Sequence, residues 1–137
     1  MVMKMTINEL RKYYYLSIEI KQIKEKLQMI AEQSVGVSEL TGMPHGTGIS
    51  DPVGRKVELL DKYSRKLELK EIEAIEEMIK IESFIETIDD VVARLIFNKR
   101  YIELKSWTKI SIEMKMSERH ILRIQRKYLE DGNNGKD

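Results

Sequence analysis

The sequence has 137 residues, enough for one domain or two small ones, and 34 % of them are charged while 42 % are hydrophobic. It contains no cysteine, which excludes disulfides and thiolate metal sites. The formal net charge is only +1, and no apolar run approaches the length of about 18 residues that marks a membrane span, so we expect a cytoplasmic protein without membrane contact.

The first predicted element is a long helix from Thr6 to about Gln33. Thr6 and Glu9 have the spacing of a capping box, which satisfies free backbone N–H groups at a helix start. Apolar residues then recur at alternating spacings of three and four, which is a heptad seam on one helix face. The seam residues are Tyr13, Leu16, Ile20, Ile23, Leu27 and Ile30.

A Gly/Pro-rich loop is predicted at residues 34–54, because this range holds five of the seven glycines and both prolines. Long loops in compact domains are uncommon and tend to be functional or disordered. Two interpretations follow. The loop is a flexible connector, or it docks on a partner protein through Met43, Pro44 and His45 at its tip.

A second long helix is expected to begin near Asp51-Pro52, because Asp is a good cap and Pro suits the first helical position. Its apolar seam drifts between Leu67 and Ala74, which indicates a change of partner or a wider apolar face. Residues 1–88 are therefore predicted to form a long antiparallel helical hairpin. The seam residues are Val53, Val57, Leu60, Tyr63, Leu67, Ala74, Met78, Ile81, Ile85 and Ile88, with Leu69, Ile72 and Ile75 beside them.

Three shorter helices complete an all-α prediction and form a helix-turn-helix module over residues 89–131. The first is amphipathic and runs from Asp89 to about Ile102, and the second covers residues 106–114. Lys115-Met116 forms a tight turn, and the third helix occupies residues 117–129. In such a helix-turn-helix pair the later helix, here the third helix of the module, lies in the major groove of DNA. Residues 132–137 are expected to be a flexible tail.

Charge is distributed unevenly along the chain. Residues 98–129 hold nine Lys or Arg and three Glu, a local net charge of +6, whereas the remaining residues carry a net charge of −5. A basic module on an acidic body is expected when the module meets nucleic-acid phosphates. The alternative interpretation is an ordinary solvated helix face.

The third helix of the module is the predicted DNA-reading element. Ile121, Ile124 and Tyr128 recur at helical spacing and should face a core formed with Ile110 and Met114. The opposite face holds the candidates for base reading, because the first turns of a recognition helix reach base edges and arginine can bond guanine O6 and N7 together. These candidates are Arg119, His120 and Arg123. The candidates for phosphate contact are Lys105, Lys109, Lys115, Arg126 and Lys127.

Two aromatic residues in the module have alternative interpretations. Trp107 is predicted to close the small core against Phe97 and Tyr101 rather than to stack on a base. His120 has no potential ligand at metal-binding spacing near it, so groove contact or plain solvation is expected instead of metal binding.

The C-terminal part resembles the phage and prophage transcriptional regulators of the RinA and ArpU type, whose C-terminal part is similar to region 4 of bacterial sigma factors. The resemblance is carried by Arg100-Tyr101-Ile102-Glu103, by residues 106–111 and by residues 117–123. It covers about 35 residues here and implies DNA binding by the helix-turn-helix. This chain has Lys115 where the family usually has Gly and Ser111 where it usually has Ala.

These observations predict a phage-type DNA-binding transcriptional regulator that reads the major groove of double-stranded DNA with residues 117–129. A homodimer is the natural companion expectation, with the hairpin used for self-association or for contact with RNA polymerase. The alternatives are a DNA-packaging adaptor similar to phage terminase small subunits, or a helical protein-interaction module without DNA binding. We expect no enzyme, cofactor or metal site, because the sequence lacks a nucleophile motif, a phosphate loop and a metal cluster.

Overall fold

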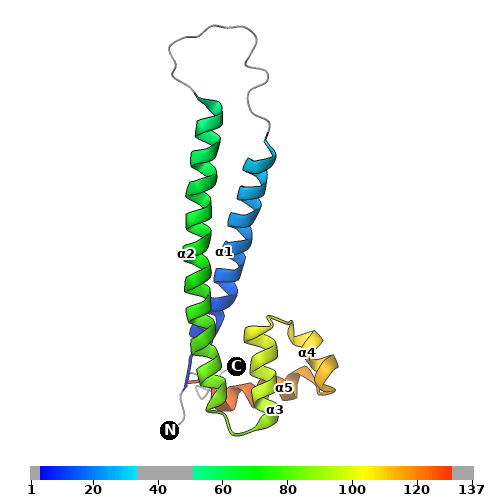
Figure 1. Ribbon diagram of the computed structural model, residues 1–137. Helices are drawn as coiled ribbons and strands as arrows, with labels where there is room; N and C mark the ends of the chain where they lie inside the picture. The colour runs from blue at the N-terminus through cyan, green and yellow to red at the C-terminus, as the bar shows by residue number, and fades with distance from the viewer. Residues whose placement is uncertain (1–3, 34–50, 131–137) are drawn as a thin grey trace. The chain divides into compact units, whose positions relative to one another are not determined.

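The computed structural model describes residues 4–33 and 51–130, and it confirms an all-α fold. The elements in chain order are α1 (Ile7–Glu32), α2 (Pro52–Glu86), α3 (Val91–Phe97), the π-helical turn η2 (Asn98–Ile102), α4 (Trp107–Met114) and α5 (Glu118–Tyr128) (Figure 1). None of the helices in these two ranges has the length and apolar content that a bilayer span requires. The predicted docking tip at Met43, Pro44 and His45 and the tail at residues 132–137 lie outside the described residues.

Local capping interactions determine where both long helices begin. The Thr6 amide donates to Glu9 Oε1 at 2.9 Å and the Glu9 amide donates to Thr6 Oγ1 at 3.1 Å, so the predicted capping box is confirmed. At α2, Asp51 Oδ1 accepts from the Gly54 amide at 3.0 Å. A Cβ atom at Gly54 would lie 2.4 Å from Asp51 Oδ2, so glycine leaves room for this cap. Helix α2 thus begins at Pro52, as Asp51-Pro52 predicts, and residues 52–54 of the predicted loop 34–54 are its first turn.

The chain divides into two compact units. One unit combines Met1–Ser17 with Glu73–Asp137, and the other is Ile18–Ile72. This division differs from the boundary that we placed between residues 88 and 89. The reason is packing, because Leu10 of α1 and Ile81 and Phe84 of α2 are completely buried in the same core as α3 and η2.

In the unit Ile18–Ile72, polar pairs connect α1 with α2. Lys70 Nζ lies 3.1 Å from Glu19 Oε1, and Lys56 Nζ donates to the carbonyl oxygens of Ala31 at 3.1 Å and Gln33 at 2.9 Å. Late residues of α1 thus pair with early residues of α2, so the two segments run in opposite directions within this unit. The hairpin over the full range 1–88 stays a prediction.

The predicted seam of α2 is wrong at its first two positions. Val53 and Val57 are 62 % and 59 % exposed. Lys56 faces the end of α1, and Val57 is rotated from it by about 100° around the helix. Val53 precedes Lys56 by almost one turn and so lies beyond the end of α1.

Two apolar clusters form the core of the other unit. The smaller of them, named the second cluster, contains Ile96, Ile110 and Ile121, with Trp107 and Met114 packed against it. It joins α3, α4 and α5 and thereby holds α5 in place. The first cluster contains Met5, Leu10, Ile81, Phe84, Ile85, Ile88, Ala93, Phe97, Tyr101 and Leu129.

Candidate nucleic-acid interface

Helix α5 begins at Ser117, as the sequence predicts. The Ser117 hydroxyl accepts from the His120 amide at 3.1 Å, which is the N-cap interaction that orders a helix start. Ile121 is fully buried, and Ile124 and Tyr128 are half-buried against the core clusters. The predicted inward face of α5 is therefore confirmed.

Sequence reasoning missed one residue on this inward face, Gln125. It is buried, and its Oε1 accepts a hydrogen bond of 2.5 Å from the hydroxyl of buried Tyr101 on η2. A buried amide needs such a partner, because its desolvation is otherwise uncompensated. The spacing in the sequence could have indicated that Gln125 is buried, since it follows Ile121 by four residues and so shares its helix face.

The opposite face of α5 is exposed and basic. Arg119, His120 and Arg123, the predicted base-reading residues, are all exposed, as are Arg126 and Lys127. Within residues 4–33 and 51–130, no ion pair joins the side chains of Arg119, Arg123 or Lys127 to another residue. Their N–H donors face solvent and can meet an incoming ligand.

The turn between α4 and α5 is left-handed at Lys115, with φ 58° and ψ 44°. Ser111 stabilises this turn through two hydrogen bonds to Met116. Its hydroxyl donates to the Met116 carbonyl at 2.6 Å, and its own carbonyl accepts from the Met116 amide at 3.2 Å. Lys115 and Ser111 therefore belong to the same turn. The Lys115 side chain is exposed beside α5, where a phosphate contact was predicted.

Helix α4 is held at its start and against α5. The Ser106 hydroxyl accepts from the Lys109 amide at 3.1 Å, and the Thr108 hydroxyl donates to Glu118 Oε2 at 3.0 Å. The side chain of Lys109 is exposed in the first turn. A second predicted phosphate contact thus lies on the solvent side of the module.

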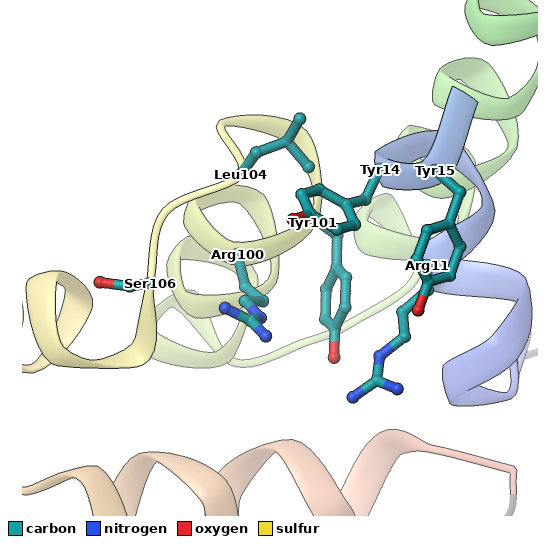
Figure 2. Close-up of a pocket in the computed structure, with 7 residues that line it drawn as sticks. All are labelled: Arg11, Tyr14, Tyr15, Arg100, Tyr101, Leu104 and Ser106. Atoms are coloured by element: carbon teal, nitrogen blue, oxygen red, sulfur yellow. The ribbon is translucent and has the colours of Figure 1, made fainter. Parts of the chain in front are cut away.

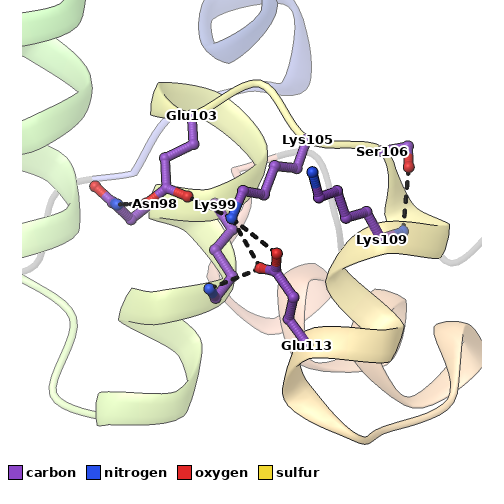
Figure 3. A network of polar contacts seen from close by, with 7 residues as sticks. All are labelled: Asn98, Lys99, Glu103, Lys105, Ser106, Lys109 and Glu113. Atoms are coloured by element: carbon purple, nitrogen blue, oxygen red, sulfur yellow. Dashed lines mark hydrogen bonds and ion pairs between the residues drawn. The ribbon is translucent and has the colours of Figure 1, made fainter.

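A network of four charged residues ties α4 to η2 (Figure 3). Glu113 Oε1 lies 2.9 Å from both Lys105 Nζ and Lys99 Nζ, and Lys105 Nζ lies 2.9 Å from Glu103 Oε1. Two hydrogen bonds lower the pKa of Glu113 from 4.5 to about 2, and the bond from Lys105 contributes more than the bond from Lys99. The hydrogen bond from Lys105 also lowers the pKa of Glu103.

The same network raises the pKa of Lys105, through its hydrogen bonds to Glu113 and then Glu103. Its ammonium group therefore already has carboxylate partners within the protein. The phosphate contact of Lys105 stays a prediction, and the exposed charge of this region resides on Lys109, Lys115 and the outer face of α5.

Trp107 has the packing role that the sequence predicts. It packs against the second core cluster, and its ring lies 6.5 Å from the Tyr101 ring in an edge-on arrangement. Arg100 covers it, with Cζ at 4.5 Å from the ring centroid. Phe97, the other predicted partner, lies in the first cluster and stacks on Tyr101 at 5.8 Å.

Among the described residues, no group of three or more His, Asp or Glu side chains has an arrangement that would hold a metal ion. Neither a protein-family model, nor a curated protein, nor a solved structure matches this chain.

Proposed function

We propose that this chain is a phage-type transcriptional regulator that inserts α5 into the major groove of double-stranded DNA. In this proposal Arg119, His120 and Arg123 read base edges. Around them, Lys105, Lys109, Lys115, Arg126 and Lys127 contact phosphates. The supporting observation is the division of α5 into a buried apolar face and an exposed basic face, on a helix joined to α4 by a tight turn.

The position of the base-reading residues follows from the cap. Ser117 starts α5, so Arg119, His120 and Arg123 lie in its first two turns, where recognition helices approach base edges. Arginine at this place offers two parallel donors to guanine, and each such pair contributes about 1–3 kcal/mol of discrimination. The more distant Lys side chains add affinity that is independent of sequence and sensitive to salt.

The proposal is tested by a fluorescence-anisotropy titration of the full chain against double-stranded DNA from the region upstream of its own gene. Arg119→Ala with Arg123→Ala should abolish the preference for this DNA over a scrambled duplex. The matched control is Arg55→Ala with Arg65→Ala, which removes two exposed charges from α2 and should leave the preference intact. Unchanged specificity in the α5 variant would reject the assignment.

The assembly state separates regulation from DNA packaging, and affinity for DNA separates both from a protein-interaction module. A dimer is expected, because symmetric half-sites require two modules, and the two copies would associate through the long helices. Analytical ultracentrifugation of the full chain measures the mass of the assembly directly. A ring of many copies would favour a DNA-packaging adaptor, and a chain without affinity for any DNA at low salt would favour a protein-interaction module. RNA polymerase is the additional partner to test where DNA binding holds.

A further inference from the structure

A pocket with a volume of about 410 Å³ lies in the unit that contains the helix-turn-helix module, and no residue of α5 is among those that line it in the described part of the chain. Arg11, Tyr14 and Tyr15 of α1 line it together with Arg100 and Tyr101 of η2 (Figure 2). Its volume lies within the range of roughly 300–1,000 Å³ that is usual for small-molecule sites. The nucleic-acid interface described above uses none of these five residues.

The pocket is positively charged. Among the residues that the structure describes, two arginines line it and no Asp or Glu does, and both guanidinium groups point in the same direction in Figure 2. Arg11 is exposed and forms no ion pair with another residue of the described ranges. Paired arginines without a carboxylate partner are suited to a phosphate, which they can hold through parallel N–H donors.

Arg100 is positioned before any ligand binds. Its Nη1 donates to the Lys105 carbonyl at 3.1 Å, and its Cζ lies 4.5 Å from the centre of the Trp107 ring. These contacts use one donor nitrogen and one face of the group, so most of its N–H donors remain for a ligand. The contacts also lower the entropic cost of binding, since the side chain is already ordered.

The two tyrosines of α1 that line the pocket are exposed to solvent. Tyr14 is 44 % exposed and Tyr15 is 55 % exposed, and their ring centroids lie 5.4 Å apart with an interplanar angle of 57°. Helical spacing places both rings on the same side of α1 as Arg11. Aromatic rings beside cationic groups are the usual surface for stacking a nucleotide base.

We propose that this pocket binds a nucleotide unit, with the phosphate between Arg11 and Arg100 and the base against Tyr14 or Tyr15. Leu104, which lines the same pocket, has a left-handed backbone with φ 60°. Non-glycine residues in this conformation cluster at ligand sites, where the surrounding structure maintains them. The source of the nucleotide unit is either a free nucleotide or an unpaired nucleotide of a nucleic acid. The inference does not depend on DNA reading by α5.

The single tryptophan of the chain provides a direct measurement, because Trp107 lies under Arg100. Its fluorescence is followed in the full chain during separate titrations with AMP, with inorganic phosphate and with a short single-stranded oligothymidylate. A saturable change with AMP is expected, and inorganic phosphate should bind more weakly because it lacks a base. Equal affinity for AMP and phosphate would overturn the role of the tyrosines.

Variants at exposed positions assign the site without disturbing the core. Arg11→Gln and Tyr14→Ala should each weaken nucleotide binding, and loss of the Arg11 contact should raise the dissociation constant at least about ten-fold. Arg55→Gln on α2 is the control and should bind as the wild type does. Dependence on Arg11 and Tyr14 for AMP identifies a free nucleotide, whereas the same dependence for oligothymidylate alone identifies a nucleic acid. Absence of binding by all probes, or binding that both variants leave unchanged, would overturn the inference.

Discussion

At the scale of single residues, the turn before α5 combines a backbone strain with its compensation. Lys115 adopts the left-handed conformation that glycine tolerates best, and Ser111 supplies a hydroxyl bond of 2.6 Å to the next carbonyl. A non-glycine residue in this conformation costs about 1–2 kcal/mol, and one neutral hydrogen bond returns about 1 kcal/mol. The serine therefore offsets much of the cost of the lysine.

Lys115→Gly should raise the free energy of unfolding by roughly 1 kcal/mol, because glycine removes this strain. Urea denaturation followed by circular dichroism measures the change. Lys109→Gly, at an exposed helical position of α4, is the matched control and should lower the free energy of unfolding by roughly 0.5–1 kcal/mol. The account of the turn would be wrong if the two variants changed stability in the same direction.

The pKa of Glu113 leads to a prediction about pH. A carboxyl group whose pKa falls from 4.5 to about 2 on folding stabilises the native state above the higher value, and this stabilisation disappears as the pH falls toward the lower one. Glu113→Gln should therefore be less stable than the wild type at neutral pH. The difference should shrink steadily as the pH approaches the lower pKa.

Urea denaturation of both proteins across this acidic range tests the prediction. Glu58→Gln, at a carboxylate without an ion pair among residues 4–33 and 51–130, serves as the control and should follow the wild type. A stability difference between wild type and Glu113→Gln that stays constant with pH would contradict the proposed network.

At the scale of elements, helix starts and the turn at Lys115-Met116 were predictable from the sequence, whereas the break inside the first helix of the module was not. Thr6, Ser106 and Ser117 cap their helices through hydrogen bonds that span three residues, so the signal is local. The predicted helix from Asp89 to Ile102 instead starts after the cap at Asp90 and changes at Asn98 to the π-helical turn η2. The apolar spacing of residues 89–102 carries no signal for that change.

The contact between η2 and α5 gives a prediction for the buried pair Tyr101 and Gln125. Tyr101→Phe and Gln125→Leu should each lower the free energy of unfolding by about 1–3 kcal/mol, because each removes one side of the buried hydrogen bond between the two side chains. The double variant should lose less than the sum of the two single losses, since it removes both polar groups. Urea denaturation of all four proteins completes the cycle, and additive losses would contradict a direct hydrogen bond.

At the scale of the molecule, the candidate interface was predictable as a stretch of sequence, but its support was not. Helical spacing placed Arg119 and Arg123 opposite Ile121 correctly, because α5 alone determines this relation. The contribution of Leu10 to the core of the module could not be read from the sequence, since it depends on a contact between residues far apart in the chain. The pocket beside Arg11 was missed for the same reason.

Leu10→Ala tests whether the start of α1 belongs to this core. The side chain is completely buried, so its truncation should lower the free energy of unfolding by about 2–5 kcal/mol. Leu69→Ala, at a position that is 68 % exposed, is the matched control and should change it by less than about 0.5 kcal/mol. Equal effects in urea denaturation would show that Leu10 is not part of the core.

The central claim is that α5 reads the major groove with arginines, and methylation interference tests it most directly. Guanine N7 faces the major groove and is one of the two acceptors that arginine bonds, so methyl groups there should block binding at defined guanines of the preferred duplex. We expect this interference for the wild-type chain and its loss, together with the sequence preference, in Arg119→Ala with Arg123→Ala. Binding to the preferred duplex that is indifferent to N7 methylation at every guanine would contradict the claim.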